Sequence, residues 1–336
     1  MIRKGERNLI TDVAGLRVGQ AEDIAARSGV TVLLADEPVT TAADIRGGAP
    51  GTRDVLGLDS IPLVDTVDAI VLSGGSAFGL DAPSGVQAFL RERERGFRIA
   101  PGLPPVPIVS GAIIFDLGNG GNKDWGEEPP YRALGKRAAE NAALDFDLGN
   151  AGAGLGALAG SYKGGLGSAS SVSDDGFTVG ALVAVNSVGS PVMPGTDAFW
   201  AYPFEQAGEF GGRAPKGPVH AGLDLPSDMK GTVRPATNTT IAIVATDAEL
   251  TTLELRRVAV MAADGFARAL RPVHTPYDGD LVFAVSTARR APSAPRPMAV
   301  MQLGHMAADC MARAIARGVY EAKTLGAFKS YRETFS

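Results

Sequence analysis

A hydroxyl group and two carboxylates stand in front of apolar runs in this chain. Thr239 and Thr240 lead directly into the β-branched run 241–245, which is typical of a buried strand. Asp278 and Asp280 stand one residue apart, before a second apolar run. A threonine hydroxyl becomes a nucleophile when a base takes its proton, and a carboxylate can orient that base. The pattern indicates nucleophilic chemistry, although strand propensity alone also places threonine at a strand start.

An α-amino group is the base that lies closest to such a hydroxyl once threonine is a chain terminus. Its ordinary pKa of roughly 7.7–8 is already near working pH. If Thr239 is that terminus, the cut is at the Asn238–Thr239 bond, through attack of the hydroxyl on the Asn238 carbonyl and hydrolysis of the resulting ester. The products would be an α chain, 1–238, and a β chain, 239–336. Residue chemistry alone leaves Thr239 and Thr240 both open.

Long ordered matches along the chain resemble one family of self-cleaving N-terminal-nucleophile amidohydrolases, the S58-type peptidases. They run from Thr11–Gly19 through Asp44–Thr52 and Leu72–Leu80 to His274–Asp280. The family contains L-aminopeptidase/D-Ala-esterase/amidases, β-peptidyl aminopeptidases and 6-aminohexanoate-oligomer (nylon-oligomer) hydrolases. The resemblance implies an α/β fold, a four-layer α/β/β/α sandwich of the aminopeptidase/ornithine-acetyltransferase type, formed by a single hydrolase domain over 1–336. It also selects Thr239 as the nucleophile.

The same resemblance implies roles for four further residues. Asn186, at the end of an apolar strand, matches an oxyanion-hole donor. Asp280 matches the acid that orients the terminal amine, and Asp278 matches a neighbour that contacts the nucleophile. Lys163 matches a lysine that points into the site, with Ser161 as the alternative register. Because carboxylates raise the pKa of a nearby amine, we expect Lys163 or desolvation to oppose them.

The turn after the strand 67–72 is a candidate for substrate binding. A nucleophile elbow is excluded because Gly-x-Ser-x-Gly is not spelled there, and a phosphate loop because no Gly-Lys-Ser/Thr ends it. Backbone N–H groups of Gly75 and Ser76 could hold a carboxylate or an oxyanion at the start of the following helix, and a purely structural turn is the alternative. Phe115 stands where the family often has a catalytic tyrosine, so it would form an apolar wall.

Composition excludes several classes of partner. The net charge is −5 with no basic block, which argues against nucleic acid. No apolar run approaches the ~18 residues of a membrane span, and no secretory signal is evident. The single cysteine, Cys310, lies at helical spacing among apolar residues and is expected in the core. The glycines of 149–160 miss the dinucleotide fingerprint, and 278–282 misses a calcium loop, so we expect no cofactor and no metal.

Hydrophobic periodicity predicts the elements that must position these residues. His274 matches no catalytic family position and is expected to be structural. Residues 194–234 show no hydrophobic periodicity, so we expect a long surface segment ahead of the predicted cut. Strands are expected at 29–35, 67–72, 108–116, 178–186, 239–246 and 281–286, and helices between 76 and 96 and at 133–144, 253–270 and 298–319.

The resulting hypothesis is amide hydrolysis through an acyl-enzyme on Thr239. The substrates would be short peptides, amino-acid amides with a free amino end, or 6-aminohexanoate oligomers. Two alternatives remain at this stage: an acyl transferase of the ornithine-acetyltransferase type, and an uncut binding protein without enzyme activity. The resemblance further implies a homotetramer, and the single cysteine and missing signal favour the cytoplasm.

Overall fold

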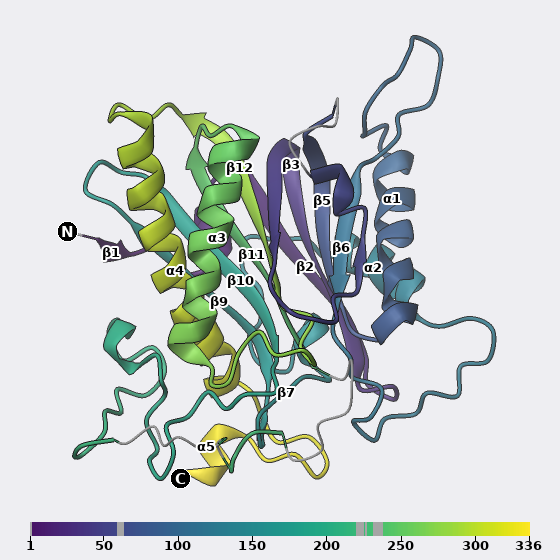
Figure 1. The fold of residues 1–336 in the computed structure, drawn as a ribbon. Helices are drawn as coiled ribbons and strands as arrows, with labels where there is room; N and C mark the ends of the chain where they lie inside the picture. The colour runs from purple at the N-terminus through teal and green to yellow at the C-terminus, as the bar shows by residue number, and fades with distance from the viewer. Residues whose placement is uncertain (1, 59–63, 220–224, 226, 231–237) are drawn as a thin grey trace.

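Ten strands of the described residues form one continuous hydrogen-bonded sheet, and its two halves, the first and the second sheet, lie face to face between two pairs of helices (Figure 1). The computed structural model describes residues 2–58, 64–219, 225, 227–230 and 238–336. Residues 235–237, which precede the Asn238–Thr239 junction, and parts of the predicted surface segment lie outside these ranges. No helix in the described ranges combines the length and apolarity needed to cross a bilayer.

The first sheet holds the strands that carry the predicted nucleophile. It contains β1 (Arg3–Lys4), β9 (Gly165–Val172), β10 (Thr178–Asn186), β11 (Thr239–Ala248) and β12 (Leu281–Arg290). Strands β9, β10 and β11 are antiparallel neighbours, whereas β11 and β12 run parallel. The parallel pairing brings the start of β12 beside the start of β11.

The second sheet is joined to the first through one long strand, β3 (Ser28–Ile45). Its first part pairs with β2 (Leu16–Asp23) and β5 (Thr66–Ser73), and its last part pairs with β12. The β3–β5 register shifts between Leu34 and Val39, just ahead of the residues of β3 that pair with β12. The sheet is completed by β6 (Val109–Ile113) and β4 (Thr52–Arg53), and a separate small ladder pairs β7 (Leu158–Ala159) with β8 (Tyr162–Lys163).

Helices cover the two outer faces of the sheet pair (Figure 1). The first sheet is covered by α3 (Thr252–Ala269) and α4 (Arg296–Tyr320), and the second by α1 (Ala82–Glu92) and α2 (Tyr131–Glu140). A short helix, α5 (Tyr331–Thr334), lies near the C-terminus. Short 3-10 turns occupy Ile10–Asp12, Leu56–Leu58, Ser76–Asp81, Gly152–Gly154 and Tyr202–Phe204.

Strand β11 is apolar on both faces because each face has a core to fill. Ile241 and Ile243 point into the cluster between the sheets, whereas Ala242 and Val244 point into the cluster under α3 and α4. This is the two-residue alternation of a strand buried on both sides. Three buried clusters, one under each helix pair and one between the sheets, therefore define four layers. The predicted α/β/β/α sandwich is confirmed.

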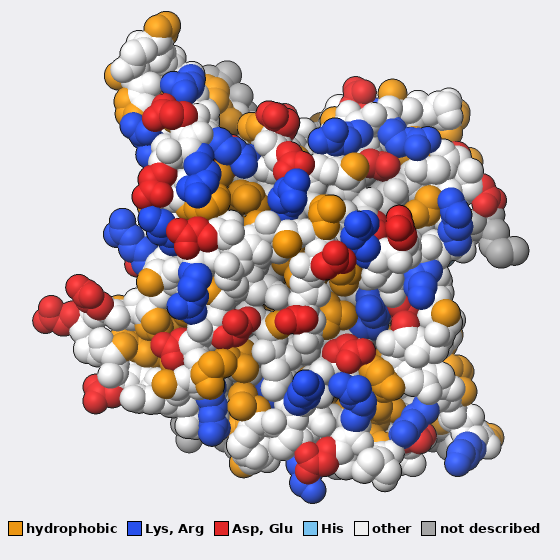
Figure 2. All heavy atoms as spheres, turned by 180° about the vertical axis from the view of Figure 1, so that it is seen from behind, with side chains coloured by type: hydrophobic (Ala, Val, Ile, Leu, Met, Phe, Trp, Pro, Cys, Tyr) orange, Lys and Arg blue, Asp and Glu red, His pale blue; other side chains and the backbone are white. Residues whose placement is uncertain are grey.

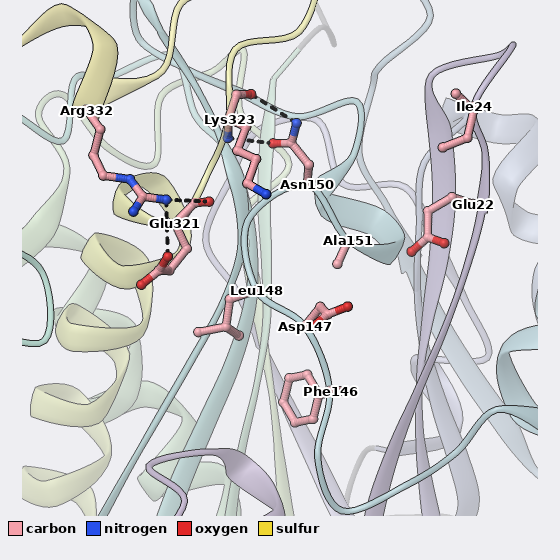
Figure 3. A pocket seen from close by; sticks show the side chains of 10 residues that line it. All are labelled: Glu22, Ile24, Phe146, Asp147, Leu148, Asn150, Ala151, Glu321, Lys323 and Arg332. Atoms are coloured by element: carbon pink, nitrogen blue, oxygen red, sulfur yellow. Dashed lines mark hydrogen bonds and ion pairs between the residues drawn. The ribbon is translucent and has the colours of Figure 1, made fainter.

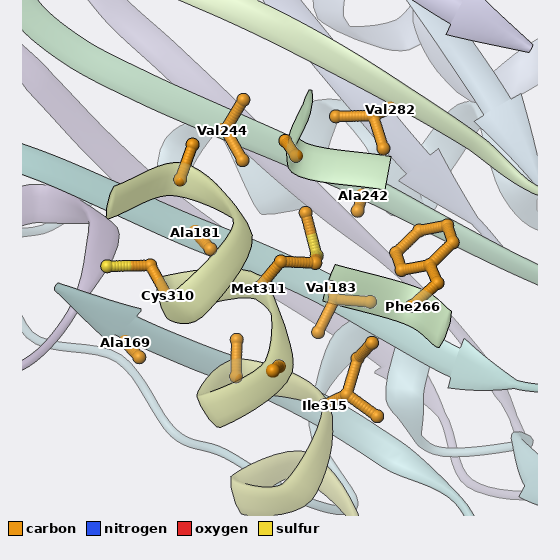
Figure 4. Packing of buried hydrophobic residues seen from close by; sticks show 14 of the residues in the cluster. Ala169, Ala181, Val183, Ala242, Val244, Phe266, Val282, Cys310, Met311 and Ile315 are labelled. Atoms are coloured by element: carbon orange, nitrogen blue, oxygen red, sulfur yellow. The ribbon is translucent and has the colours of Figure 1, made fainter. Parts of the chain in front are cut away.

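The core under α3 and α4 is built from small strand residues and larger helix residues. In Figure 4, Phe266 of α3 and Met311 and Ile315 of α4 lie over Ala181 and Val183 of β10. Cys310 is fully buried in the same cluster, as predicted, and burial raises the pKa of its thiol. Helix α3 begins at a capping box, in which Thr251 and Glu254 satisfy each other's backbone N–H groups.

Most predicted elements agree with the structure within a few residues, and two differ clearly. Strand β3 extends far beyond the predicted 29–35, because its polar and only partly buried second half is held in the strand by backbone pairing with β12, which apolar periodicity does not reveal. The segment after Ser76 is first a 3-10 turn, and the α-helix begins only at Ala82, with Pro83 in its first turn. On the face shown in Figure 2, acidic and basic side chains are interspersed.

Candidate active site

Thr239 is the first residue of β11 and lies opposite Asn186, the last residue of β10. The Thr239 side chain is nearly buried, at 3% exposed. Its hydroxyl donates a hydrogen bond to the carbonyl oxygen of Asn238, the residue on the other side of the predicted scissile bond. The β10–β11 register therefore places a hydroxyl, the preceding carbonyl and the Asn186 carboxamide at one end of the first sheet.

The Asp278-Gly279-Asp280 segment brackets this junction. The N–H of Gly279 donates to the Asn238 carbonyl oxygen at 3.0 Å, and Asp280 Oδ1 accepts the N–H of Thr240 at 2.8 Å. A parallel bridge between Asn238 and Asp278 continues the β11–β12 pairing across the junction. The segment is thus an extension of the parallel ladder that aims one backbone donor at the Asn238 carbonyl.

Gly279 has no room for a side chain. A Cβ atom at this position would lie 2.6 Å from the carbonyl oxygen of Ala49 and 2.8 Å from Thr239 Oγ1. Ala49 belongs to the glycine-rich loop after β3, and its N–H donates to the Asp278 carbonyl at 2.9 Å. In the same loop, the Arg46 N–H donates to the Asp280 carbonyl at 2.9 Å. The loop therefore fixes the position of the two aspartates through backbone contacts.

The two carboxylates have different partners. Asp278 accepts from the Thr275 hydroxyl at 2.6 Å and from the Val188 N–H at 3.2 Å. Burial, and then the charge of Asp280, raise the pKa of Asp278. Asp280 Oδ2 lies 2.9 Å from His274 Nδ1 and also accepts the His274 N–H. Sequence reasoning missed this contact of His274 with the Asp280 carboxylate, since no spacing rule joins those two positions.

Asn186 is held at both ends of its carboxamide. Nδ2 donates to the carbonyl oxygen of Phe115 at 3.1 Å, and Oδ1 accepts the N–H of Leu158 at 3.0 Å. Phe115 therefore contacts the site through its backbone, just after β6 of the second sheet. The contact explains how a residue of the other sheet reaches the Thr239 junction, and it leaves one proton on Nδ2 beyond the bond to Phe115.

Lys163 is fully buried, and its ammonium contacts backbone only. Nζ donates to the carbonyl oxygens of Gly154, Ala157 and Gly164 at 2.8–2.9 Å. Burial lowers the pKa of Lys163 to about 7, and the charge of Asp116 opposes that shift. Because an ammonium has three donors, these carbonyls occupy all of them. The structure therefore places Lys163 behind the segment that contacts Asn186, rather than against Thr239.

A second lysine, Lys230, reaches the cluster and was missed by sequence reasoning. Its Nζ donates to Asn186 Oδ1 at 3.3 Å. Burial lowers the pKa of Lys230 to about 7, and the charge of Asp278 raises it in part. Lys230 lies in the aperiodic segment before Asn238, where a lysine is ordinarily read as solvated. No local pattern distinguishes it.

Gly75 and Ser76 make their backbone hydrogen bonds away from the Thr239 junction. The Gly75 N–H donates to Asp116 Oδ1 at 2.8 Å, and the Ser76 N–H donates to the Ile114 carbonyl at 3.0 Å. Asp116 also accepts from the Ser28 hydroxyl at 2.6 Å, and burial raises the pKa of Asp116. The N–H groups predicted to hold a substrate carboxylate thus already hold a carboxylate and a carbonyl of the chain itself.

Asn186, Thr239, Asp278 and Asp280 together form what we call the Thr239 cluster. A surface hollow elsewhere in the described residues is lined by none of them. Its volume is about 550 Å³, and Figure 3 shows Phe146 and Leu148 on one side and Glu22 on the other. Arg332 pairs with Glu321 at 3.3 Å at its rim. Glu22 there accepts the Gly152 N–H, and the candidate nucleophile and acids lie instead at the β10–β11 end.

The chain is similar to known proteins along most of its length. The model of peptidase family S58 matches residues 8–332. An uncharacterised aminopeptidase of Mycobacterium tuberculosis strain H37Rv is 42% identical, over 98% of both chains. A 6-aminohexanoate-oligomer endohydrolase of Paenarthrobacter ureafaciens is 31% identical, over 84% of this chain and 76% of its own length.

Solved structures show the same fold. The L-aminopeptidase D-Ala-esterase/amidase of Ochrobactrum anthropi, described as a variant of the Ntn-hydrolase fold, superposes with a TM-score of 0.70 at 21% identity, covering 97% of this chain and 89% of its own. A β-aminopeptidase of Burkholderia sp. gives a TM-score of 0.69 at 23% identity, covering 98% and 91%. With the family model spanning almost the whole sequence and a relative at 42% identity, the chain is a member of peptidase family S58.

Proposed function

We propose that this amide hydrolase activates itself by cutting the Asn238–Thr239 bond and then works through an acyl-enzyme on Thr239. The observation that carries the proposal is the arrangement around one carbonyl. The Asn238 carbonyl oxygen accepts hydrogen bonds from the Thr239 hydroxyl and, at 3.0 Å, from the Gly279 N–H. A nucleophile and a backbone donor for the developing oxyanion therefore meet at the same peptide group.

The self-cleavage step follows from this arrangement. The Thr239 oxygen attacks the Asn238 carbonyl carbon, and the negative charge that develops on the carbonyl oxygen is stabilised by the Gly279 N–H. The C–N bond breaks as the hydroxyl proton passes to the leaving nitrogen, which leaves an ester between Asn238 and Thr239 Oγ1. Water hydrolyses the ester, which releases the Asn238 carboxylate and restores the Thr239 hydroxyl beside the α-amino group freed in the previous step.

The cut creates the base for turnover. The new α-amino group takes the Thr239 hydroxyl proton as the oxygen attacks a substrate amide, and gives a proton to the leaving amine. Asp280, which accepts the neighbouring Thr240 N–H at 2.8 Å, is positioned to orient that amine. Asn186, whose Nδ2 keeps one proton beyond its bond to Phe115, supplies a donor to the substrate oxyanion. Water then hydrolyses the acyl-enzyme.

The substrates are amides that present a free amino end: short peptides, amino-acid amides, or 6-aminohexanoate oligomers such as the named relatives act on. The single domain over 1–336 would then consist of an α chain, 1–238, and a β chain, 239–336. A cytoplasmic homotetramer belongs to the same proposal and rests on resemblance and composition. The acyl-transferase and uncut-binding alternatives are not favoured, because the family and its named relatives are hydrolases.

Thr239→Ala tests the proposal, with Thr240→Ala as the matched neighbour. Denaturing electrophoresis should show the wild type and Thr240→Ala as two chains and Thr239→Ala as one. The mass of the smaller chain should correspond to 239–336. Hydrolysis of an amino-acid anilide and of 6-aminohexanoate dimer should be lost in Thr239→Ala alone. Efficient cutting or turnover in Thr239→Ala would remove this residue from the mechanism.

A further inference from the structure

The Thr239 cluster contains two carboxylates, Asp278 and Asp280. The lysine predicted to act beside them, Lys163, makes its hydrogen bonds elsewhere. Lys163 Nζ donates its three N–H groups to the carbonyl oxygens of Gly154, Ala157 and Gly164. It therefore supports the 154–164 segment and has no donor left for a second partner. Asp278 is buried, at 1% exposed, so a positive charge near it would favour its ionised form.

Lys230 is held close to Asp278 through Val188, which contacts both residues. Its N–H donates to the Val188 carbonyl at 2.9 Å, and the Val188 N–H in turn donates to Asp278 Oδ1 at 3.2 Å. Lys230 and Asp278 are thus bound to the same residue. The Lys230 ammonium continues to Asn186 Oδ1, the carboxamide that lies opposite Thr239 in the sheet.

The segment that carries Lys230 is anchored just before it. Asp228 accepts a hydrogen bond from the Ser190 hydroxyl, and its carbonyl accepts the Ser161 N–H at 2.9 Å. These contacts fix the chain two residues upstream of Lys230. The ammonium is therefore brought to Asn186 by an anchored backbone.

We propose that Lys230 is a positioning residue for self-cleavage: in the uncut chain its ammonium fixes the Asn186 carboxamide and supplies the positive charge that Asp278 lacks. The inference rests on the proposed function, since it concerns the step that cuts Asn238–Thr239.

The physical reason is that the uncut chain has no Thr239 ammonium. Before the cut, the nitrogen of Thr239 is a neutral amide, so Asp278 and Asp280 face no terminal cation. Lys230 stands in for it while the Asn238 carbonyl is attacked. After the cut, the new α-amino group lies in the same field, and a second positive charge nearby disfavours its protonation. Lys230 then helps to keep the nucleophile's base neutral.

The state of Lys230 should depend on pH in the working range. Burial lowers its pKa to about 7, and Asp278 is the charge that opposes this shift. Other titratable groups around it in the described residues include Asp280 with His274 against it, Lys163, and Asp228 two residues upstream. Since the folded chain holds Lys230 charged below this pKa and neutral above it, its help to self-cleavage is lost as pH rises through about 7. Arginine keeps its charge throughout, because its pKa lies above about 12.

The test measures the rate at which freshly purified uncut chain gives the fragment that begins at Thr239. Lys230→Met should slow it roughly 10- to 100-fold, as expected for loss of a hydrogen bond from a charged donor. Lys230→Arg should cut at a rate close to that of the wild type at low pH. The ratio of the Lys230→Arg rate to the wild-type rate should rise from about pH 6 to about pH 8. Lys216→Met, an exposed lysine of the same segment, is the matched control and should cut normally.

Folding is checked separately, by comparing the melting temperature of Thr239→Ala with that of Thr239→Ala/Lys230→Met, neither of which can cut. A wild-type cutting rate in Lys230→Met, or a pH-independent ratio for Lys230→Arg, overturns the inference and leaves the proposed function intact. Cutting in Thr239→Ala overturns the proposed function itself. The two failures are therefore distinguishable on the same gels.

Discussion

Two turns at strand ends each contain a glycine whose backbone N–H donates a hydrogen bond, but to different kinds of acceptor. At Gly75, after β5, a backbone N–H donates to the buried carboxylate of Asp116 at 2.8 Å. At Gly279, before β12, a backbone N–H donates to the Asn238 carbonyl at 3.0 Å. Both glycines leave no space for a Cβ, at Gly75 because of the Tyr131 ring and at Gly279 because of Thr239.

The difference lies in what the donor faces. The Gly75 donor meets a carboxylate that also accepts from Ser28, so both the donor and its acceptor are held within the protein. The Gly279 donor meets a peptide carbonyl that has a hydroxyl beside it. A saturated turn stabilises the fold, whereas a turn that polarises a carbonyl beside a nucleophile can carry chemistry.

Gly279→Ala should have the largest effect on this contrast. The new Cβ would lie 2.8 Å from Thr239 Oγ1 and 2.6 Å from the Ala49 carbonyl, so it must displace the donor or the nucleophile. We expect self-cleavage to slow by about 10²–10³-fold, the cost of losing an oxyanion donor. Gly217→Ala, where a Cβ meets no atom within 4 Å, is the control on the same gel. Unimpaired cutting in Gly279→Ala would show that the N–H is only structural.

Gly75→Ala should act on stability instead. Gly75 has a φ of +85°, and a Cβ there would lie 2.1 Å from Tyr131 Cζ. Backbone strain of this kind costs about 1–3 kcal/mol, and the contact with the ring adds to it. Denaturant unfolding of the Thr239→Ala background should show the loss. Protein that does fold should still cut itself; a folded variant that fails to cut would place Gly75 in the reaction.

Ser76→Ala should have the smallest effect. No side-chain hydrogen bond of Ser76 appears among the described residues, and its N–H is held by the Ile114 carbonyl. We expect stability to change by less than about 0.5 kcal/mol and KM and kcat for an amino-acid anilide to stay unchanged. A rise in KM with kcat preserved would restore the substrate-binding role that the sequence suggested for this turn.

Local pattern accounts for most of the elements and for part of the site. The alternation of Ile241 and Ile243 with Ala242 and Val244 predicts a strand buried on both faces, and α3 is anticipated by its apolar stripe. The pairing of Asp280 with the Thr240 N–H follows from two apolar runs in parallel register, but the parallel register itself is not written in either run. The sequence suggests that Lys163 points towards Thr239. Residue type does not reveal the three backbone carbonyls that accept its hydrogen bonds instead.

The sequence by itself determined the elements and the chemical groups: a threonine at the start of a core strand, an asparagine at the end of another, and two acids before a third. Periodicity and side-chain chemistry are local properties, and they survive in any fold. Only the tertiary structure decided which groups meet. That Gly279 faces the Asn238 carbonyl, that His274 contacts Asp280 and that Lys230 rather than Lys163 reaches Asn186 all depend on strand order and loop paths. Those contacts join residues that are far apart along the chain or are brought together by the path of a loop. No spacing rule encodes them.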